Sequence, residues 1–538
     1  MLGHGVAVQF DEKRIDAIFA GVDQCHLPGA AVGIAIGGKP VYRKGFGLAN
    51  IELPVMLSPS TRMRIHSTTK HFACLAYMLL CEEGKAAIND PIGKYLPELN
   101  PVARDVTLCQ LMGNIGGLRD SHDLFWKFSG PAAQIAVEDV LSFYRDVDDV
   151  NFPPGTSWSY NNGGFVLLTA AIERIAGNAL EDVLREFIFE PVGMHDTLLR
   201  RLNTDFVPGS ASMHMVNRSG GYDKSYLGLA LSGDGGVVST VNDMLRWLAH
   251  MDAPRVGSAA TWAVMRASQT LANGTSTGYG LGLEMDLYRG VERLSHAGGG
   301  LGANSQMLKV PAACLDIAIM VNRHDVSATL LADSILDACL PGLEPLKTVP
   351  GGRFPTGVFH SPTTGRVIQL GTSCVRTPFF KEGQPIISIN GSDIAITPDD
   401  NGVFRAIGDS YMKLAMTVVG EPEHPRSIRF DEFGNLDDLN SVPPVDVSDA
   451  EAIVGCYRSE ATGTQLTILK GDDGPRLSSG GRFGSNQFTL YCLGRRIWQA
   501  KPLNIANLGG GILLFDGDYA AVRFSSDRTW MLPFRRCS

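Results

Sequence analysis

The pattern of apolar residues changes near residue 341, and this change constrains the fold more than any other feature of the chain. Before it, segments with apolar residues at helical spacing alternate with segments at strand spacing. After it, helical periodicity is hard to find, and short strand-like runs lie between Gly, Pro and Asp turns. A stretch rich in Pro and Gly, residues 341–352, separates the two parts. We therefore expect an α+β domain followed by an all-β region.

Strand-like and helix-like segments lie at both ends of the first part. The expected elements are a helix over 11–24, strands over 30–36, 41–47, 305–310 and 315–321, and a helix over 328–340. Segments that are distant in sequence but together build one antiparallel sheet are typical of an α+β domain. The sequence thus predicts a single domain over residues 1–341.

The second part divides once more, at the loop-like segment 441–444 with the sequence Ser-Val-Pro-Pro. The two pieces, 342–444 and 445–538, both consist of short β-rich runs between turns. Such runs are typical of small antiparallel barrels or sandwiches. We expect two all-β domains that resemble barrels.

The composition argues against several classes of function. The chain has 538 residues and a formal net charge of −9 without a dense block of Lys and Arg, which argues against a nucleic-acid-binding surface. It has no apolar run of about 20 residues, so we expect no membrane span, and its N-terminal residues do not resemble a signal peptide. The 10 cysteines lack the spacing of a zinc site, and such scattered thiols favour a cytoplasmic location.

A serine and a lysine three residues apart open a strongly apolar segment. Ser67 and Lys70 begin the stretch 67–83, which we expect to form a buried helix. On a helix such residues share a face, so the Ser67 hydroxyl can meet the Lys70 amine. A buried lysine must be paired or neutral, and the helix N-terminus beneath Ser67 favours an alkoxide. Taken alone, the pattern also fits a capped helix with a surface lysine.

Two further motifs follow at long intervals along the chain. Tyr160 and Asn162 lie on one short segment after a Pro-Gly turn, which places a phenol near a carboxamide, although an ordinary aromatic turn has the same pattern. His296 precedes Gly298 and Gly299 in a strand-like run, which indicates backbone that a ligand approaches closely. The alternative is a glycine-rich bulge with a satisfied histidine.

In this order, the three motifs resemble those of the penicillin-recognising serine hydrolases. Tyr-x-Asn in second place resembles the class C β-lactamase branch, and His in third place resembles its D-aminopeptidase, D-amino-acid amidase and esterase members. Residues 111–118, 191–194 and 233–236 are also similar to family marks, with Gly116 where serine is usual. The whole chain resembles the three-domain bacterial D-aminopeptidases. This implies a serine β-lactamase/transpeptidase-like catalytic domain, two β-barrel domains and a homodimer.

The resemblance implies a role for each motif residue. Ser67 is the expected nucleophile, which forms an acyl-enzyme that water hydrolyses. The backbone N–H groups of Ser67 and Gly299 are the expected oxyanion hole. Lys70 and Tyr160 are the expected bases, which titrate as a coupled pair. A cationic lysine favours the phenolate, whereas burial favours a neutral lysine, so either residue can be the base. Asn162 is expected to hydrogen-bond the substrate amide or Lys70.

Three more expectations concern the surroundings of these residues. His296 replaces the family's usual lysine, is expected to hydrogen-bond Tyr160, and would change its charge near about pH 6.5. The loop 500–509, with Asn504, is expected to enter the cleft as a wall behind a short acyl group, unless it is a plain surface hairpin. The acid that this loop carries in the family is absent here. Glu284 is the candidate partner for a substrate ammonium, unless it faces solvent.

Three functions remain as alternatives. The first is an aminopeptidase that releases N-terminal D-Ala-like or Gly residues from small peptides, amino-acid amides or esters. The second is a broad-specificity esterase or β-lactamase-like hydrolase of the same fold, and the third is a non-catalytic binding protein. We expect no metal, no organic cofactor, and neither a nucleic-acid nor a membrane partner.

Overall fold

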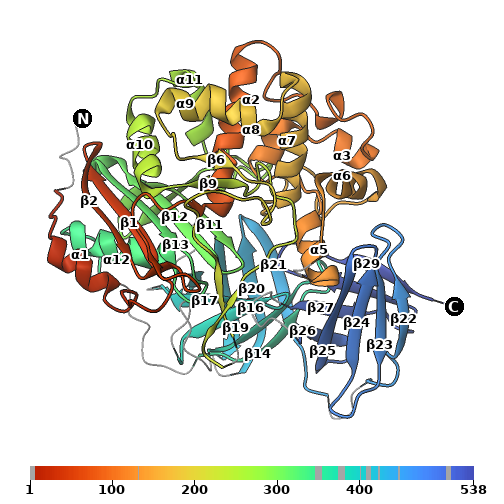
Figure 1. Ribbon diagram of the computed structural model, residues 1–538. Coiled ribbons are helices and arrows are strands. Elements are labelled where there is room, and N and C mark those ends of the chain that lie inside the picture. The colour runs from red at the N-terminus through yellow and green to blue at the C-terminus, as the bar shows by residue number, and fades with distance from the viewer. Residues whose placement is uncertain are drawn as a thin grey trace.

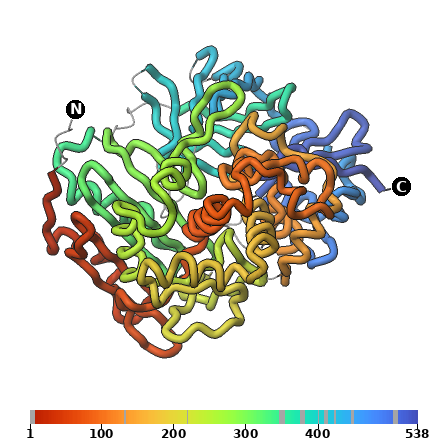
Figure 2. Tube along the Cα trace, turned by 90° about the horizontal axis from the view of Figure 1, so that it is seen from above, coloured from red at the N-terminus to blue at the C-terminus, as the bar shows by residue number. Residues whose placement is uncertain are grey.

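The chain folds into three parts that lie side by side (Figure 1). The structure, a computed structural model, describes residues 7–537 except 131–132, 218, 346–353, 374–381, 400, 408–412, 422–423, 446–448 and 504–509. A six-stranded antiparallel sheet with helices on both faces forms the first part, and two closed antiparallel barrels form the others. The α+β domain and the two barrel-like domains expected from the sequence are thereby confirmed. The view from above in Figure 2 shows the N-terminus and the C-terminal barrel at opposite ends of the molecule.

The central sheet joins the two ends of the α+β part. Its strand order is β10-β11-β12-β13-β1-β2, so an N-terminal strand lies beside one from the end of this part. β1 pairs with β13 from Ala30 opposite Val321 to Ile36 opposite Leu315. The strands are β1 (Ala30–Ile36), β2 (Lys39–Phe46), β10 (Glu284–Tyr288), β11 (Val291–Gly300), β12 (Ala303–Val310) and β13 (Leu315–Val321).

Helices cover both faces of this sheet (Figure 1). α1 (Glu12–Phe19) and α12 (Ala328–Cys339) share an apolar core with one face. On the other side lies a larger core that includes α2 (Lys70–Glu82), α7 (Asn162–Ala176) and α10 (Val241–Asp252). Because apolar layers lie on both sides, β1 and β13 are buried along almost their whole length.

Shorter elements complete the α+β part. Its other helical segments are η1 (His66–Thr69), η2 (Ile92–Lys94), α3 (Pro101–Arg104), α4 (Leu108–Met112), α5 (Ser121–Ser129), α6 (Val137–Asp146), α8 (Leu180–Leu184), η3 (Arg185–Phe189), α9 (Glu190–Val192), α11 (Ala259–Arg266) and η4 (Pro311–Ala313). Its short strands are β3 (Leu48–Asn50), β4 (Val55–Met56), β5 (Met63–Arg64), β6 (Leu198–Leu199), β7 (His214–Val216), β8 (Tyr222–Lys224) and β9 (Val237–Ser239).

The first barrel closes through β14 and β21, where Phe359 lies opposite Ser441. Alternate side chains point inward and form their own apolar core. Its β20–β21 turn places Phe433 against Trp158, with ring centroids 5.3 Å apart, just before Tyr160. The strands are β14 (Gly357–His360), β15 (Val367–Thr372), β16 (Pro385–Ile389), β17 (Ser392–Pro398), β18 (Phe404–Ala406), β19 (Leu414–Glu421), β20 (His424–Glu432) and β21 (Asn435–Ser441).

Helix α5 of the α+β part packs into the second barrel. The ring of Phe128 lies 4.9 Å from that of Phe524 and 5.8 Å from that of Phe534. The barrel core is therefore continuous with the main core of the α+β part. The strands are β22 (Gly455–Arg458), β23 (Gln465–Leu469), β24 (Arg476–Gly481), β25 (Gly484–Gly494), β26 (Ile497–Pro502), β27 (Gly511–Phe515), β28 (Ala521–Ser525) and β29 (Leu532–Arg536).

Two expected helices begin or end differently from the prediction. The helix expected over 11–24 already ends at Phe19. In the segment 67–83, Ser67 lies in the 3-10 turn η1, and Lys70 is the first residue of α2. His66, directly before Ser67, has a φ of +48°, a left-handed conformation that is strained for a residue with a side chain. Apolar periodicity carries no signal for such a turn.

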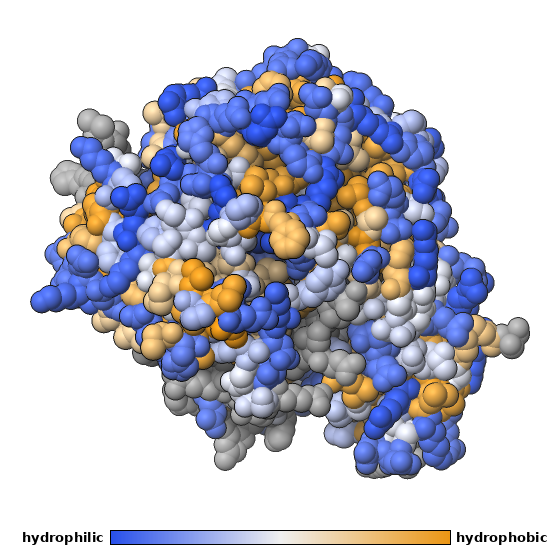
Figure 3. All heavy atoms as spheres, in the orientation of Figure 1, coloured by the Kyte–Doolittle hydropathy of each residue, from blue (hydrophilic) through white to orange (hydrophobic). Residues whose placement is uncertain are grey.

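The face of the molecule in Figure 3 is mainly hydrophilic, with apolar side chains in scattered patches. Within the described part of the chain, no helix is both long and apolar enough to cross a membrane.

Candidate active site

Ser67 and Lys70 meet as the sequence predicts. Lys70 Nζ lies 3.2 Å from Ser67 Oγ. The lysine side chain is fully buried, whereas Ser67 is partly exposed. The alternative of a surface lysine is therefore wrong, and of this pair only Ser67 is partly exposed.

Two further oxygen atoms surround the Lys70 amine. Asn162 Oδ1 and the backbone oxygen of Asp234 each lie 2.7 Å from Nζ. Burial lowers the pKa of Lys70 to about 7, while the charge of Asp234 acts in the opposite direction. A neutral amine has two N–H donors and one lone pair. It can donate to both of these oxygens and still accept a hydrogen bond from Ser67.

Tyr160 covers the same amine with its ring. Lys70 Nζ lies 4.7 Å from the ring centroid. Removal from water raises the pKa of Tyr160, although its hydrogen bond with Ser67 and the charge of Arg528 lower it. Tyr160 therefore remains a protonated phenol at neutral pH. Of the two effects weighed from the sequence, burial outweighs the charge of a cationic lysine, so neutral Lys70 is favoured and the phenolate is not.

Asn162 occupies the first position of α7. Asn161 caps this helix by accepting a hydrogen bond from Gly164 N at 2.8 Å. The cap fixes the chain direction between Tyr160 and the helix, and it thereby turns the Asn162 amide toward Lys70. Of the two expected partners for Asn162, the structure shows Lys70.

The hydrogen bonds of His296 go to groups other than the predicted Tyr160, whose ring centroid lies 6.4 Å from that of His296. Its Nδ1 lies 2.6 Å from the backbone oxygen of Ala297 and its Nε2 lies 3.0 Å from the Tyr279 hydroxyl. Both ring nitrogens are thus used, and the predicted hydrogen bond to Tyr160 is wrong. Nδ1 donates to the carbonyl and Nε2 accepts from Tyr279, which requires a neutral ring.

The expectation of a histidine that changes charge near neutral pH is also wrong. Burial, followed by the charge of Lys70, lowers the pKa of His296 to about 3. The side chain is 1% exposed. Sequence alone could not show this, because burial and the Tyr279 contact are tertiary features.

The segment after His296 runs close beside the turn that holds Ser67. The Thr68 hydroxyl donates to the backbone oxygen of His296 at 3.2 Å. A Cβ on Gly298 would meet Ile65 O at 2.0 Å, so only glycine fits there. Gly299 is exposed, and a Cβ there would meet nothing within 4 Å. Gly299 thus offers open backbone at the edge of the site, as expected for close approach by a ligand.

Glu284 is buried beside His296. Its side chain is 6% exposed, and its Oε1 lies 4.0 Å from His296 Nε2. The alternative that it faces solvent is wrong. Its charge contributes to raising the pKa of both Tyr160 and Tyr279, after the larger effect of burial.

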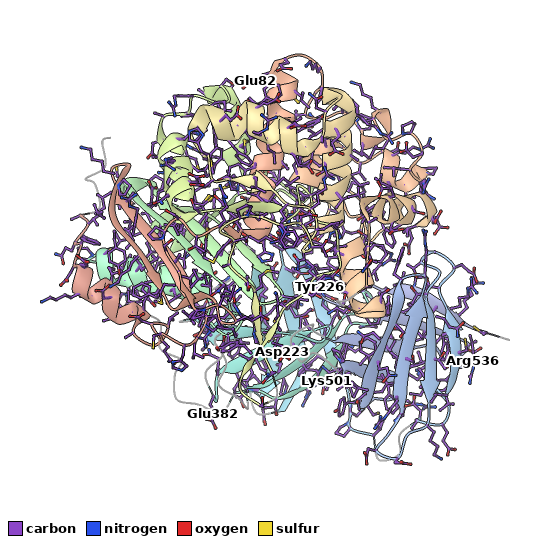
Figure 4. All side chains as sticks on the ribbon, viewed as in Figure 1. Glu82, Asp223, Tyr226, Glu382, Lys501 and Arg536 are labelled. Carbon is purple, nitrogen blue, oxygen red and sulfur yellow. The ribbon has the colours of Figure 1, made fainter. Side chains whose placement is uncertain are left out.

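Only residues 500–503 of the predicted wall loop lie within the described part of the chain. Asn504 and the rest of 504–509 lie outside the described residues. Lys501, labelled in Figure 4, belongs to the end of β26 and is exposed.

A different turn of the same barrel reaches the site. It lies between β28 and β29, and Arg528 from this turn has its guanidinium carbon 5.0 Å from the Tyr160 ring centroid. The last domain thus places a side chain beside Tyr160 from a turn that sequence reasoning did not indicate, while the prediction for the loop 500–509 stays a prediction. Arg528 stands in an ordinary polar turn, and no spacing rule distinguishes it from other turn arginines.

Asp234 is a second residue whose role the sequence did not indicate. Its carboxylate Oδ2 lies 3.4 Å from His122 Nε2. Burial raises its pKa, but the interaction with His122 and the charge of Lys70 outweigh burial and bring the pKa of Asp234 to about 2. The one sequence signal for Asp234 is its place in the segment 233–236, which is similar to a family mark. In the described residues, no group of His, Cys, Asp and Glu side chains is arranged to hold a metal ion.

Comparisons with known proteins agree with this geometry. A D-aminopeptidase from Cereibacter sphaeroides is 28% identical over 479 residues, which cover 88% of this chain and 87% of that protein. Two solved structures share the fold. The octameric penicillin-binding protein homologue from Pyrococcus abyssi has a TM-score of 0.55 at 18% identity and covers 98% of this chain and 100% of its own. The D-amino acid amidase from Ochrobactrum anthropi SV3 complexed with D-phenylalanine has a TM-score of 0.53 at 22% identity and covers 61% and 98%.

The match to a family model spans the whole α+β part. The model is described as Beta-lactamase and matches residues 15–340, which include Ser67, Lys70, Tyr160 and His296. The chain therefore belongs to the beta-lactamase family.

Proposed function

We propose that this protein is a serine hydrolase that acts through an acyl-enzyme and releases N-terminal D-amino acids from small peptides, amides or esters. The observation that carries the proposal is the buried Lys70 amine, 3.2 Å from Ser67 Oγ and with a pKa of about 7. The D-aminopeptidase relative, similar over 88% of the chain, supports the substrate class.

Acylation begins at Ser67. Neutral Lys70 takes the hydroxyl proton while Oγ attacks the substrate carbonyl carbon. The backbone N–H groups of Ser67 and Gly299 stabilise the oxyanion, and each such donor typically contributes about 3 kcal/mol. Lys70 is thus assigned as the base, because Tyr160 keeps its proton at neutral pH.

Collapse of the tetrahedral intermediate needs a proton for the leaving amine. We assign this proton to the Tyr160 phenol, which contacts Ser67 and then regains a proton from the Lys70 ammonium. In deacylation, water gives a proton to Lys70 and attacks the ester, and Lys70 returns that proton to the departing Ser67 oxygen. Asn162 holds Lys70 in place through Oδ1, and we assign its amide N–H to a substrate oxygen.

His296 and Glu284 belong to the part of the site that strands β11 and β10 of the central sheet form. Neutral His296, bonded to Tyr279, stabilises the strand that presents Gly298 and Gly299. The carboxylate of Glu284 adds negative charge to the enclosed region near His296, and we propose that this charge favours a substrate ammonium.

A panel of small substrates tests the proposal. D-Ala p-nitroanilide, L-Ala p-nitroanilide and a p-nitrophenyl ester would be compared by kcat/KM. We expect the D-anilide to exceed the L-anilide at least tenfold. Ester hydrolysis without anilide hydrolysis would instead support the broad esterase reading. A protein that a fluorescent penicillin and all three substrates fail to acylate would be a binding protein.

Three further expectations stay proposals. We propose a homodimer, to be checked by the mass in solution, and domain boundaries at 341/342 and 444/445, to be checked by limited proteolysis.

We also propose a cytoplasmic location, which the free thiols of the described cysteines support. Cys456 Sγ and Cys537 Sγ lie 2.9 Å apart, so an oxidising compartment would join them. A bridge between them in protein isolated without reductant would contradict this location.

A further inference from the structure

The turn between β28 and β29, residues 526–531, is fixed to the catalytic part at several points. The Asp123 carboxylate accepts hydrogen bonds from the Ser526 hydroxyl at 2.5 Å and the Thr529 hydroxyl at 2.8 Å. Asp123 belongs to α5, the helix that packs into this barrel. The turn is thus anchored on both sides of Arg528.

Asn151 of the catalytic part holds the backbone of Arg528 itself. Its amide Nδ2 donates to the backbone oxygen of Arg528 at 2.7 Å, and its Oδ1 accepts from Trp530 N at 3.0 Å. Arg119 also donates to the backbone oxygen of Trp530 at 2.9 Å. A side chain on backbone that is held this way starts from a defined position, which reduces the entropy lost on binding a ligand.

Within the described part of the chain, the guanidinium of Arg528 makes two long contacts with carboxylates, and the charge of Asp123 acts on it as a third. Nη1 lies 3.4 Å from Asp120 Oδ2, and Nε lies 3.6 Å from Asp527 Oδ2. Both distances are longer than a good charged hydrogen bond of about 2.7–2.9 Å. A guanidinium has five N–H donors, and among the described residues only these two long contacts engage them.

The same guanidinium is partly exposed. The side chain of Arg528 is 34% exposed, although it lies over the Tyr160 ring. Ser67, Tyr160 and Asn162 are likewise partly exposed, whereas Lys70 and His296 are buried. Arg528 therefore lies against the Tyr160 ring and, like Ser67, Tyr160 and Asn162, is partly open to an approaching substrate. At the far end of β29, Arg536 lies on the outer side of the barrel, away from the catalytic part (Figure 4).

We propose that Arg528 determines specificity by binding a carboxylate of the substrate. This inference rests on the proposed function for the nature of the scissile bond. The carboxylate is either the C-terminal group of a dipeptide, on the leaving side, or a side-chain acid of the N-terminal residue, on the acyl side. Either group carries its charge above about pH 5 and matches the two parallel N–H donors of an arginine.

Two substrate pairs separate these sources. D-Ala-Gly against D-Ala-glycinamide tests the leaving side, and D-Glu α-p-nitroanilide against D-Gln p-nitroanilide tests the acyl side. In one of the two pairs, the wild-type kcat/KM should be at least tenfold higher for the substrate that carries the free carboxylate. Arg528→Gln should reduce that preference to less than twofold, mainly through KM, and Arg528→Lys should retain part of it. Arg523→Gln, at an exposed position of β28 in the same barrel, is the matched control and should change nothing.

Two results would overturn the inference. One is a wild type without preference in either pair, and the other is an equal loss on all four substrates in Arg528→Gln, which would place Arg528 in the support of Tyr160 or of the domain contact. If no amide is hydrolysed, the proposed function fails separately. The p-nitrophenyl monoester of succinic acid, compared with its methyl ester, then tests Arg528 by the same tenfold criterion, and a protein inert toward both esters overturns the inference as well.

Discussion

The amine of Lys70 lies 3.2 Å from the hydroxyl of Ser67, and its two other close neighbours are oxygen atoms that can only accept hydrogen bonds. This arrangement makes the protonation state of Lys70 decide the role of Ser67. An ammonium donates to all three oxygens, so Ser67 accepts and its oxygen is not activated. A neutral amine satisfies the two acceptors and turns its lone pair to Ser67, which then donates its proton. Burial without a carboxylate in direct contact with Nζ explains why the neutral form is accessible.

Activity should therefore rise with pH through about 7. The pKa of Lys70 is lowered to about 7, so the fraction of neutral base grows as the pH increases through this value. We expect kcat/KM for a neutral ester to increase tenfold per unit on the acid limb and to level off above about pH 8. A profile measured from pH 5 to 9 checks this.

A variant of His296 tests whether the acid limb of the pH profile belongs to Lys70. The pKa of His296 is about 3, so His296→Asn should lower the rate but leave the midpoint unchanged. A midpoint that disappears with His296, or a flat wild-type profile from pH 6 to 9, would contradict the assignment of Lys70.

Replacement of Ser67 by alanine should abolish hydrolysis without loss of the fold. The partly exposed hydroxyl is a small part of the packing, whereas the acyl-enzyme cannot form without it. We expect a loss of at least about 10³-fold in kcat and an unchanged melting temperature. Ser60→Ala, at an exposed serine, serves as the control. Turnover above a few per cent of wild type in Ser67→Ala would show that another residue is the nucleophile.

Two adjacent glycines should respond differently to alanine. In Gly298→Ala the new Cβ would meet Ile65 O at 2.0 Å, and backbone cannot yield as a flexible side chain does. Such overpacking typically costs about 1–3 kcal/mol, so the melting temperature should fall. In Gly299→Ala the Cβ meets nothing within 4 Å, so stability should be kept. Equal melting temperatures for both variants would mean that strand β11 does not lie against the Ser67 turn as described.

The spacing of apolar residues predicted much of the fold. The strands Ala30–Ile36 and Leu315–Val321 were predicted at their observed bounds, because apolar runs between turns have few alternatives. The 3-10 turn at Ser67 was not, because it depends on a positive φ at His66 that tertiary packing imposes. Local sequence patterns do not predict such backbone strain.

The sequence predicted only those site residues that belong to motifs occurring in a characteristic order along the chain. Ser67, Lys70 and Asn162 were predicted together, and the structure brings them together. The partner of His296 was wrong, because Tyr279 has no motif of its own and reaches the ring through the fold. Arg528 was missed for the same reason. It comes from a distant barrel, and docking of α5 into that barrel sets its position.

The last prediction concerns Glu284 and the substrate amine. A free N-terminal ammonium loses hydration when it enters an enclosed site, and a nearby negative charge compensates part of that loss. The Glu284 carboxylate lies 4.0 Å from His296 Nε2, and it contributes to the field at Tyr160. Glu284→Gln keeps the shape of the side chain but removes the charge. We expect kcat/KM for D-Ala p-nitroanilide to fall at least tenfold, about 1.4 kcal/mol, and that for a neutral ester to change less than twofold. Glu292→Gln, at an exposed glutamate of β11, should leave both rates unchanged. Equal losses on both substrates in Glu284→Gln would mean that the carboxylate supports His296 or the fold and not the ammonium, and no loss on either would favour the esterase reading.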